Sequence, residues 1–336
     1  AGGIDLTVDL ADETVTAVAP PITYNNTFVE AHSTTLGDIV IDQNDVDTNN
    51  EALEIEATWF RDPSGAGLSE GITTVDGNII VQSDEEIEVV NGSFVSAQGS
   101  YVVMEVNIDD GILENNGTIE TEDGPIHLIA DKMDLQDGTI DANGANNVYL
   151  NVWQLADDIR LTVADTNAAG ANILELSDNE LGTVDEVGDS NALIIGLSTT
   201  AGDAADGIIT NVIQVQDSVN GIQLFGGDVD LSTATGTDST NNLTLVTDAH
   251  IDDDGVVRTL TVDGQLTLDT EDGVFGSVGG VGTGRLSVVA DRIAARSRAA
   301  GELRLSSTAV NLGAPIQSLA DHGGAAWVVA IIDANA

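Results

Sequence analysis

The pentapeptide GTIET at residues 117–121 returns 21 residues later as GTIDA at residues 138–142. Each copy precedes a short segment of alternating apolar residues, IHLIA at 126–130 and VYLNV at 148–152, and these two segments are 22 residues apart. Short strands that return about every 20 residues are typical of stacked coils. The repeat therefore predicts a solenoid in which 117–121 and 138–142 lie in adjacent coils.

Similar strand-like segments run almost from end to end, with Gly, Asn and Asp clusters between them that suit tight corners. In the last third, segments that begin at Leu243, Leu266, Leu286 and Leu303 follow one another at spacings of 23, 20 and 17 residues, which predicts one ladder. The best helix candidate is 288–298, and we interpret most of it as strand because its repeat neighbours are strands. Asn-Asn pairs at several corners could stack as ladders.

We therefore expect an all-β fold, a single elongated parallel β-helix (β-solenoid). It should hold roughly 15 coils of about 22 residues and be on the order of 70 Å long. Tandem β-sandwich domains are the alternative. The expected organisation is an amino-terminal cap or irregular first coils with loops at 1–76, β-helix repeats at 77–320, and a carboxyl-terminal strand at 321–336 that could contact another subunit.

The composition limits the partners. There are 57 acidic and 9 basic residues, for a formal charge of -48, so nucleic acid and anionic membrane surfaces should be repelled. Cations are the natural counter-species, and one lysine with abundant Asp suits salty or calcium-rich surroundings, although the charge could simply maintain solubility. No apolar run reaches the ~18 residues of a membrane span, so no membrane insertion is expected. The chain has no cysteine and begins at Ala1, and we expect a mature or excised segment.

The segments GTIETEDGPIHLIADKMDLQDGTIDANG (117–144) and GGVGTGRLSVVADRIAARSRAAGELRLSSTAVNLG (279–313) resemble filamentous-haemagglutinin-type secreted β-helix proteins. These bacterial surface adhesins repeat glycine, alternating aliphatic strands and Asn/Gly corners. The resemblance covers 77–320 and implies a right-handed parallel β-helix, an extracellular or cell-surface location, and adhesion or matrix building. The chain departs from the family in its acidity, and it shows no amino-terminal secretion motif.

A calcium site is the metal-binding hypothesis. Carboxylates and amides at 45–56 imitate an Asp-x-Asp-x-Asn calcium loop, whose spacing can place six to eight oxygens around one ion. A solvated acidic corner is the alternative, and no other cofactor is expected. The candidate ligands are Asp45, Asp47, Asn49, Glu51 and Glu56. Asp252, Asp253 and Asp254 form a second acidic corner, which we interpret as a turn.

An enzymatic function is the less favoured alternative. The four histidines share no metal-ligand spacing, and His127 fits a structural role in a strand. Its neighbours Asp131, Lys132 and Asp134 raise the possibility of a carbohydrate-active β-helix enzyme, a polysaccharide lyase or glycoside hydrolase. We expect no enzyme, because the basic residues that would neutralise a uronate are scarce before residue 250. Asn-x-Ser/Thr sequons at Asn25, Asn91, Asn116 and Asn242 permit glycosylation on exposed corners, although such triplets also arise by chance in an Asn-rich chain.

Assembly is predicted from charge and from the last strand. Residues 285–304 carry a local charge of +3, and 325–333 form an apolar strand that could add to a neighbouring subunit. The expected partner is the protein itself, in a head-to-tail homo-oligomer or filament, or cell-surface glycans. Alternatively, the strand completes its own last coil and the arginines pair internally. The assembly residues are Arg285, Arg292, Arg296, Arg298, Arg304, Trp327, Val329 and Ile331.

Overall fold

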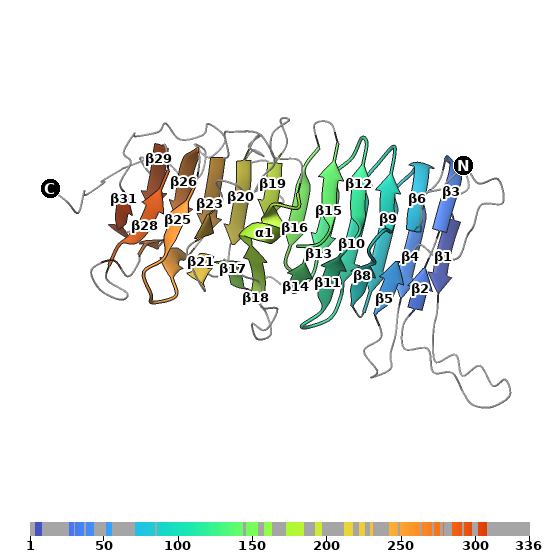
Figure 1. Ribbon diagram of the computed structural model, residues 1–336, viewed down its shortest axis with the longest axis horizontal. Helices are drawn as coiled ribbons and strands as arrows, with labels where there is room; N and C mark the ends of the chain where they lie inside the picture. Colours follow the sequence, from blue (N-terminus) through green and yellow to red (C-terminus); the bar gives the residue numbers. More distant parts are fainter. Residues whose placement is uncertain are drawn as a thin grey trace, which may run out of the picture.

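The chain folds into an elongated stack of parallel strands, with residues 4–8 at one end and residues 302–307 at the other (Figure 1). The structure is a computed structural model. It describes residues 4–8, 27–29, 31–36, 38–43, 52–55, 71–84, 86–143, 146–153, 158–162, 173–184, 192–196, 212–217, 222–225, 229–230, 242–247, 249–262, 264–270, 272–275, 278, 284–290, 292–297 and 302–307.

One sheet, here sheet A, runs the length of the stack and has eleven strands. All of its strand pairs are parallel. Its strands are β1 (Ile4–Val8), β4 (Ile39–Gln43), β7 (Ile79–Ser83), β10 (Val102–Val106), β13 (Ile126–Ile129), β16 (Val148–Asn151), β19 (Ala192–Ile195), β20 (Val212–Asp217), β23 (Asn242–Thr247), β26 (Gln265–Thr270) and β29 (Arg292–Ser297).

Two five-stranded sheets complete the coils of the amino-terminal half, and each coil passes from sheet A to sheet B to sheet C. Sheet B contains β2 (Thr27–Val29), β5 (Leu53–Ile55), β8 (Ile87–Val89), β11 (Ile112–Asn115) and β14 (Lys132–Asp134). Sheet C contains β3 (Ala31–Leu36), β6 (Gly71–Asp76), β9 (Phe94–Ala97), β12 (Thr118–Thr121) and β15 (Thr139–Ala142). Strands of all three sheets therefore occur before residue 77.

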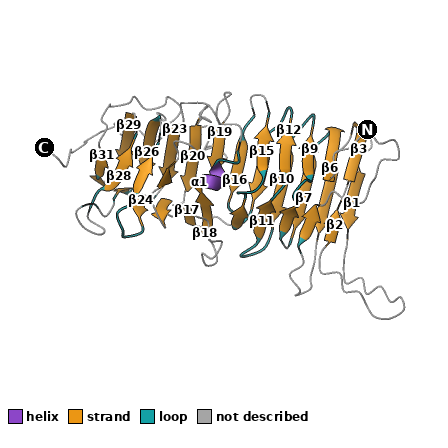
Figure 2. Cartoon of the chain, in the orientation of Figure 1, coloured by secondary structure: helices purple, strands orange, loops and turns teal. Residues whose placement is uncertain are grey.

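The carboxyl-terminal half uses a second pair of sheets beside sheet A. Sheet D contains, in spatial order, β18 (Ile173–Ser177), β17 (Asp158–Thr162), β21 (Ile222–Phe225), β24 (His250–Asp253), β27 (Gly273–Val274) and β30 (Glu302–Leu303). Sheet E contains β22 (Val229–Asp230), β25 (Thr259–Thr261), β28 (Leu286–Val289) and β31 (Leu305–Ser307). In the described part of the chain, Figure 2 shows mostly strands, with one short helix, α1 (Asp178–Leu181), where the two halves meet.

The predicted β-solenoid is confirmed, and so is the repeat that suggested it. Ile119 is the register partner of Ile140 on adjacent strands of sheet C, and both are fully buried. Ile126 is likewise the partner of Val148 in sheet A. Parallel pairing between successive coils does not fit the alternative of tandem sandwich domains, which are built from antiparallel sheets.

Two details of the prediction were wrong. Sheet A has eleven strands in the described residues instead of roughly 15, because the coils are longer than expected: 40 residues separate Ile39 from its partner Ile79. The Leu-x-Leu segments do not form one ladder. Leu243 pairs with Leu266 in sheet A, but Leu286 belongs to sheet E. Within 288–298, the described strand residues 288–289 belong to β28 and 292–297 form β29, which agrees with the strand interpretation.

The glycine that opens each copy of the repeat has a physical reason. Gly117 and Gly138 sit at the corner between sheets B and C, where each coil lies on the backbone of the preceding one. A Cβ at Gly117 would lie 2.5 Å from the carbonyl oxygen of Ser93, and one at Gly138 would collide with Asn115. Any side chain would therefore push the two coils apart. The corner asparagine Asn115 stacks on Val89, so no asparagine ladder forms there.

The apolar core continues to the last described coil. β29 is the outermost described strand of sheet A, yet its inward side chains Ile293 and Ala295 are fully buried. The core is therefore not open to solvent at β29.

Candidate functional site

Four of the five strands of sheet B carry a carboxylate at the same register position, one of them buried (Glu54) and the other three half-buried on the exterior. The register places Glu54 beside Glu88, Glu88 beside Glu114, and Glu114 beside Asp134. We call these four residues the acidic column. Adjacent parallel strands are ~4.8 Å apart, so like charges are stacked at close range. The Nδ2 amide of Asn116 donates to Glu114 Oε1 at 2.6 Å and to Glu88 Oε1 at 3.3 Å.

Glu86 directly precedes β8, the strand that carries Glu88. Burial raises the pKa of its carboxyl group above the ordinary value of 4.5, and repulsion from Glu114 and Glu88 raises it further. The exterior of sheet B is thus a strongly negative surface, suited to small cations and unsuited to an anionic ligand.

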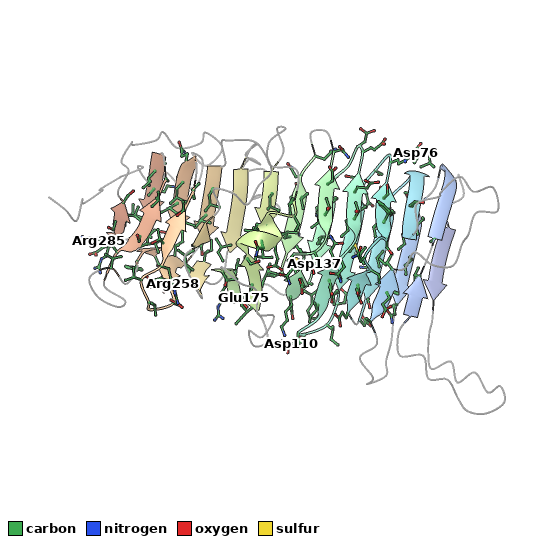
Figure 3. The ribbon with its side chains drawn as sticks, in the orientation of Figure 1. Asp76, Asp110, Asp137, Glu175, Arg258 and Arg285 are labelled. Carbon is green, nitrogen blue, oxygen red and sulfur yellow. The ribbon has the colours of Figure 1, made fainter. Side chains whose placement is uncertain are left out.

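The exterior of sheet A has the opposite character. At one outward position of five successive strands, β4 to β16, the register partners are aliphatic or aromatic, and all of them are half-buried. We call this set the neutral row; it consists of Val40, Ile80, Val103, His127 and Tyr149. The outward position two residues further along carries Asp42, Gln82, Glu105, Ile129 and Asn151. Figure 3 marks the two edges of this sheet, with Asp76 at the corner between sheets C and A and Asp110 at the corner between sheets A and B.

Two members of the neutral row stack on each other. The rings of His127 and Tyr149 are parallel within 1°, and their centroids are 4.3 Å apart. Burial lowers the pKa of the His127 imidazole below its ordinary value of 6.5, so this residue is neutral at physiological pH. The stack therefore adds no charge to the neutral row.

Uncharged polar groups border the neutral row. Asn78, Tyr101 and Asn147 precede three of its strands, and Gln82 and Asn151 lie two residues beyond Ile80 and Tyr149. The Asn147 Nδ2 amide donates to the Tyr149 hydroxyl at 3.3 Å. Two carboxylates also lie at this border. Asp42 is the register partner of Gln82, and Glu105 accepts a hydrogen bond from Gln82 Nε2 at 2.7 Å. An apolar centre with amides and hydroxyls around it can hold an uncharged polar ligand.

In the carboxyl-terminal half, the described side chains at the same outward register position of sheet A are buried instead of accessible. The register continues the row through Thr244, Thr267 and Ala294, and all three are buried. Beside them the Arg296 guanidinium binds Asp269 through two hydrogen bonds, Nε–Oδ1 at 2.8 Å and Nη2–Oδ2 at 2.6 Å. Arg296 is 1% and Asp269 0% exposed. Among the side chains of this row whose burial the structure describes, the accessible ones are thus those of the neutral row.

The calcium residues Asp45, Asp47, Asn49, Glu51 and Glu56 lie outside the described residues. Within the described ranges no three His, Asp or Glu side chains come together as a metal-binding group.

The second acidic corner is only partly the turn interpreted from the sequence, because Asp252 and Asp253 end β24 and the chain bends from Asp254 onward. Asp253 Oδ1 accepts the backbone N–H of Gly255 at 3.2 Å, and Asp254 binds Arg258 at 3.0 and 2.8 Å. Its carboxylates are therefore engaged in holding the corner closed.

The residues of the enzymatic alternative do not converge on one surface. His127 is on the exterior of sheet A, whereas Asp134 belongs to the acidic column on sheet B. Asp131 is buried at the corner between the two sheets, where its Oδ2 accepts the backbone N–H of Asp110 at 2.9 Å. Lys132 Nζ lies 2.9 Å from Asp110 Oδ1. Lys132 and Asp134 therefore share the outward side of β14, whereas His127 lies on another sheet and Asp131 is buried.

The predicted assembly arginines are partly engaged within the chain. Arg296 is buried with Asp269 and cannot reach a neighbouring subunit. Arg304 forms an ion pair with Glu302, and its guanidinium carbon lies 5.7 Å from the ring centroid of Phe275. Arg285 is bridged through its backbone to Val278, and Arg292 pairs through its backbone with Gln265. Arg298, Trp327, Val329 and Ile331 lie outside the described residues.

Sequence reasoning missed both surfaces, although a signal for each was present. Three consecutive apolar residues at 39–41, 79–81 and 102–104 indicate strands that are apolar on both faces, where a simple two-sided strand would alternate. Glu88 and Glu114 each lie inside a short apolar strand, which predicts that they share an outward face. What the sequence did not give was the register that aligns these positions.

In the described part of the chain no helix has the length and hydropathy of a membrane span. Comparisons with protein-family models, with curated proteins and with solved structures find no significant match to this chain.

Proposed function

We propose that this protein is an extracellular structural or adhesive β-solenoid that contacts uncharged carbohydrate of a cell surface or matrix through the exterior of sheet A. The observation that carries the proposal is the neutral row, which runs across five successive strands of a protein whose formal charge is -48. A half-exposed apolar stripe on an otherwise acidic surface is the kind of feature that marks an interaction site.

The charge selects the class of partner. Acidic polysaccharides, nucleic acids and other copies of this chain are all negatively charged and would be repelled at low ionic strength. Neutral polysaccharides offer C–H faces that can lie on Val103 and Ile80, and hydroxyl groups that can bond to amides such as Asn78 and Asn151. A long, flat sheet face suits a polymer better than a single small molecule.

A structural role follows from the same geometry. Eleven parallel strands at a spacing of ~4.8 Å make a rod about 50 Å long. Such a rod can hold a contact surface at a distance from the body to which it is attached. Head-to-tail joining of subunits through 325–333 is a separate prediction, to which Arg296 does not contribute because it is buried.

Binding to neutral polysaccharides tests the proposal. The purified protein is titrated with a mannan, a neutral β-glucan and a galactan, with alginate as the acidic comparison. Val103→Asp places a charge in the middle of the neutral row, and we expect it to weaken binding by about tenfold or more. Thr118→Asp introduces the same charge on the exterior of sheet C, where Thr118 is also half-buried, and should leave binding unchanged.

Both variants should melt at temperatures close to that of the wild type, because both positions face outward. Equal binding by wild type and Val103→Asp, or binding of alginate alone, would overturn the proposed contact.

A further inference from the structure

The corner between β8 and β9 protrudes from the stack. Val89 and Asn115 are register partners, and so are Phe94 and Thr118. Between these two pairs the first coil has four residues, 90–93, whereas the next coil has two, 116–117. The extra residues Asn91 and Gly92 have no counterparts in the next coil and form the tip of a turn.

The turn presents Asn91 to solvent. The backbone N–H of Ser93 donates to the Val90 carbonyl at 2.9 Å and closes a four-residue turn. Gly92 has φ +87° and no atom within 4 Å of the position that a Cβ would occupy, so there is open space beside Asn91. The Asn91 side chain is exposed, and Asn91-Gly92-Ser93 is an Asn-x-Ser sequon.

The other described sequons differ from this one. The Asn116 Nδ2 amide is held by two carboxylates, and its corner is so tight that a Cβ on Gly117 would press on Ser93. Ser93 and Thr244, the hydroxyl residues of the Asn91 and Asn242 sequons, are both fully buried, so the acceptor asparagine is what distinguishes the two sequons. Asn91 lies in a turn, whereas Asn242 begins β23, which pairs with β20 on one side and with β26 on the other. Asn25 lies outside the described residues. The three described sequons are therefore not equivalent as acceptors.

We propose that Asn91 is an N-glycosylation site of this protein, an inference that rests on the extracellular location in the proposed function. The Asn91 Nδ2 nitrogen attacks C1 of a sugar carried on a diphosphate donor. A new N–C1 bond forms, the C1–O bond to the diphosphate breaks, and the amide proton passes to a base of the transferase. The donor is a sugar nucleotide or a lipid-linked oligosaccharide, since both have this leaving group.

The position of the corner supports the assignment. Each amino-terminal coil has three sides, and the corner between sheets B and C lies opposite sheet A. A glycan on Asn91 would project away from the neutral row and leave the proposed contact surface uncovered. It would also extend from the rim of the acidic surface of sheet B, where a neutral polymer meets no repulsion.

Peptide mapping by mass spectrometry tests the assignment on the full chain purified from its natural source and on the chain secreted from a cell that glycosylates sequons. A protease that cleaves after Asp and Glu is suitable, because the chain has only 9 Lys and Arg residues. We expect a glycan mass on the peptide that contains Asn91 and none on those with Asn116 or Asn242. A single-sugar mass indicates the nucleotide donor, and an oligosaccharide mass indicates the lipid-linked donor.

Three variants complete the experiment. Asn91→Gln and Ser93→Ala should each abolish the mass shift, whereas Asn116→Gln should leave it unchanged. A bare Asn91 in both preparations would overturn the inference, provided that a sequon tag fused to the secreted chain is modified in the same cells. Glycan on Asn116 in place of Asn91 would overturn it as well. Polysaccharide binding by Asn91→Gln separates the two proposals, because loss of the glycan should leave contact through sheet A intact.

Discussion

A carboxylate oxygen of Glu180 accepts a hydrogen bond from the backbone N–H of Leu135 at 3.2 Å, although 45 positions separate the two residues. The other oxygen accepts the backbone N–H of Ser177 at 2.7 Å, and the Ser177 hydroxyl accepts the N–H of Glu180 at 3.2 Å. This reciprocal pair is a capping box at the start of α1. Because Leu135 directly follows β14 and Ser177 ends β18, Glu180 ties the end of sheet B to the start of sheet D.

Replacing Glu180 should therefore weaken the junction between the two halves. Glu180→Ala removes the acceptor of two buried N–H groups, and we expect a loss of about 2–4 kcal/mol in the free energy of unfolding. Glu180→Gln keeps one acceptor oxygen and should cost less. Urea denaturation measures both, with Glu122→Gln at an exposed corner as the control. If Glu180→Ala is as stable as the control, the contact with Leu135 does not hold the halves together.

The buried pair Arg296–Asp269 gives a second prediction. Arg296→Met leaves the Asp269 carboxylate buried without its guanidinium, and breaking such a pair typically costs about 3–5 kcal/mol. The double variant Asp269→Leu/Arg296→Met removes both charges and should recover most of the lost stability. Arg304→Met breaks the exposed pair with Glu302 and should cost under about 1 kcal/mol. Denaturation of all three variants would show whether the double variant recovers. A double variant less stable than Arg296→Met alone would contradict this reading.

The stacked fold was predictable because two local requirements repeat together. The glycine at 117 and 138 is dictated by contact with the preceding coil, and the isoleucines at 119 and 140 are dictated by the narrow core. Both residue types therefore recur 21 positions later in the sequence. The buried state of both isoleucines predicts that Ile140→Asp would unfold the coil, since the charge would have no partner there.

The number of coils and the contact surface were not predictable in the same way. Leu193 pairs with Val148 across 45 residues, whereas Ile126 pairs with Val102 across 24. The 45-residue interval contains two strands of sheet D, β17 and β18, and the helix α1, so a fixed period fails there. The neutral row depends on the register of five strands, which only the stacked backbone defines. The bond from Glu180 to Leu135 has no sequence signal, although Ser177-x-x-Glu180 is a recognisable capping box.

The pH dependence of stability should have two opposing components, the first from Glu86. Its pKa is raised in the folded state, so its contribution to stability is fully present below the ordinary value of 4.5 and is lost as the pH rises through the raised pKa. Glu86→Gln should therefore raise the melting temperature near pH 7 and have little effect near pH 4. Thermal melts of wild type, Glu86→Gln and the exposed control Glu122→Gln across this range measure the difference. A variant that melts below the wild type at neutral pH would contradict the repulsion from Glu88 and Glu114.

His127 supplies the opposite component. Its pKa is lowered in the folded state, so its contribution is fully present above the ordinary value of 6.5 and is lost as the pH falls through the lowered pKa. His127→Phe keeps a flat ring against Tyr149 and removes the ionisable group. The melting temperature of His127→Phe should fall less than that of the wild type between neutral and mildly acidic pH. Identical pH profiles would show that His127 does not govern this loss.

Cations should stabilise the protein, because the acidic column stacks like charges in successive coils. Two unit charges about 4 Å apart repel by about 1 kcal/mol even in bulk water, and 1 M salt shortens the screening length to about 3 Å. We therefore expect the melting temperature to rise with sodium chloride and to rise further with calcium, most clearly at low ionic strength. The double variant Glu88→Gln/Glu114→Gln should reduce the dependence on sodium chloride.

Calcium and sodium chloride at matched ionic strength separate screening from a specific site. A calorimetric binding isotherm that saturates and is lost in Asp45→Asn/Asp47→Asn/Glu56→Gln would support the calcium loop predicted at 45–56. If sodium chloride gives the same stabilisation and calorimetry detects no calcium binding, these residues are excluded as ligands. General screening of the acidic column would then account for the effect, because a diffuse ionic atmosphere relieves repulsion without an ordered set of ligands.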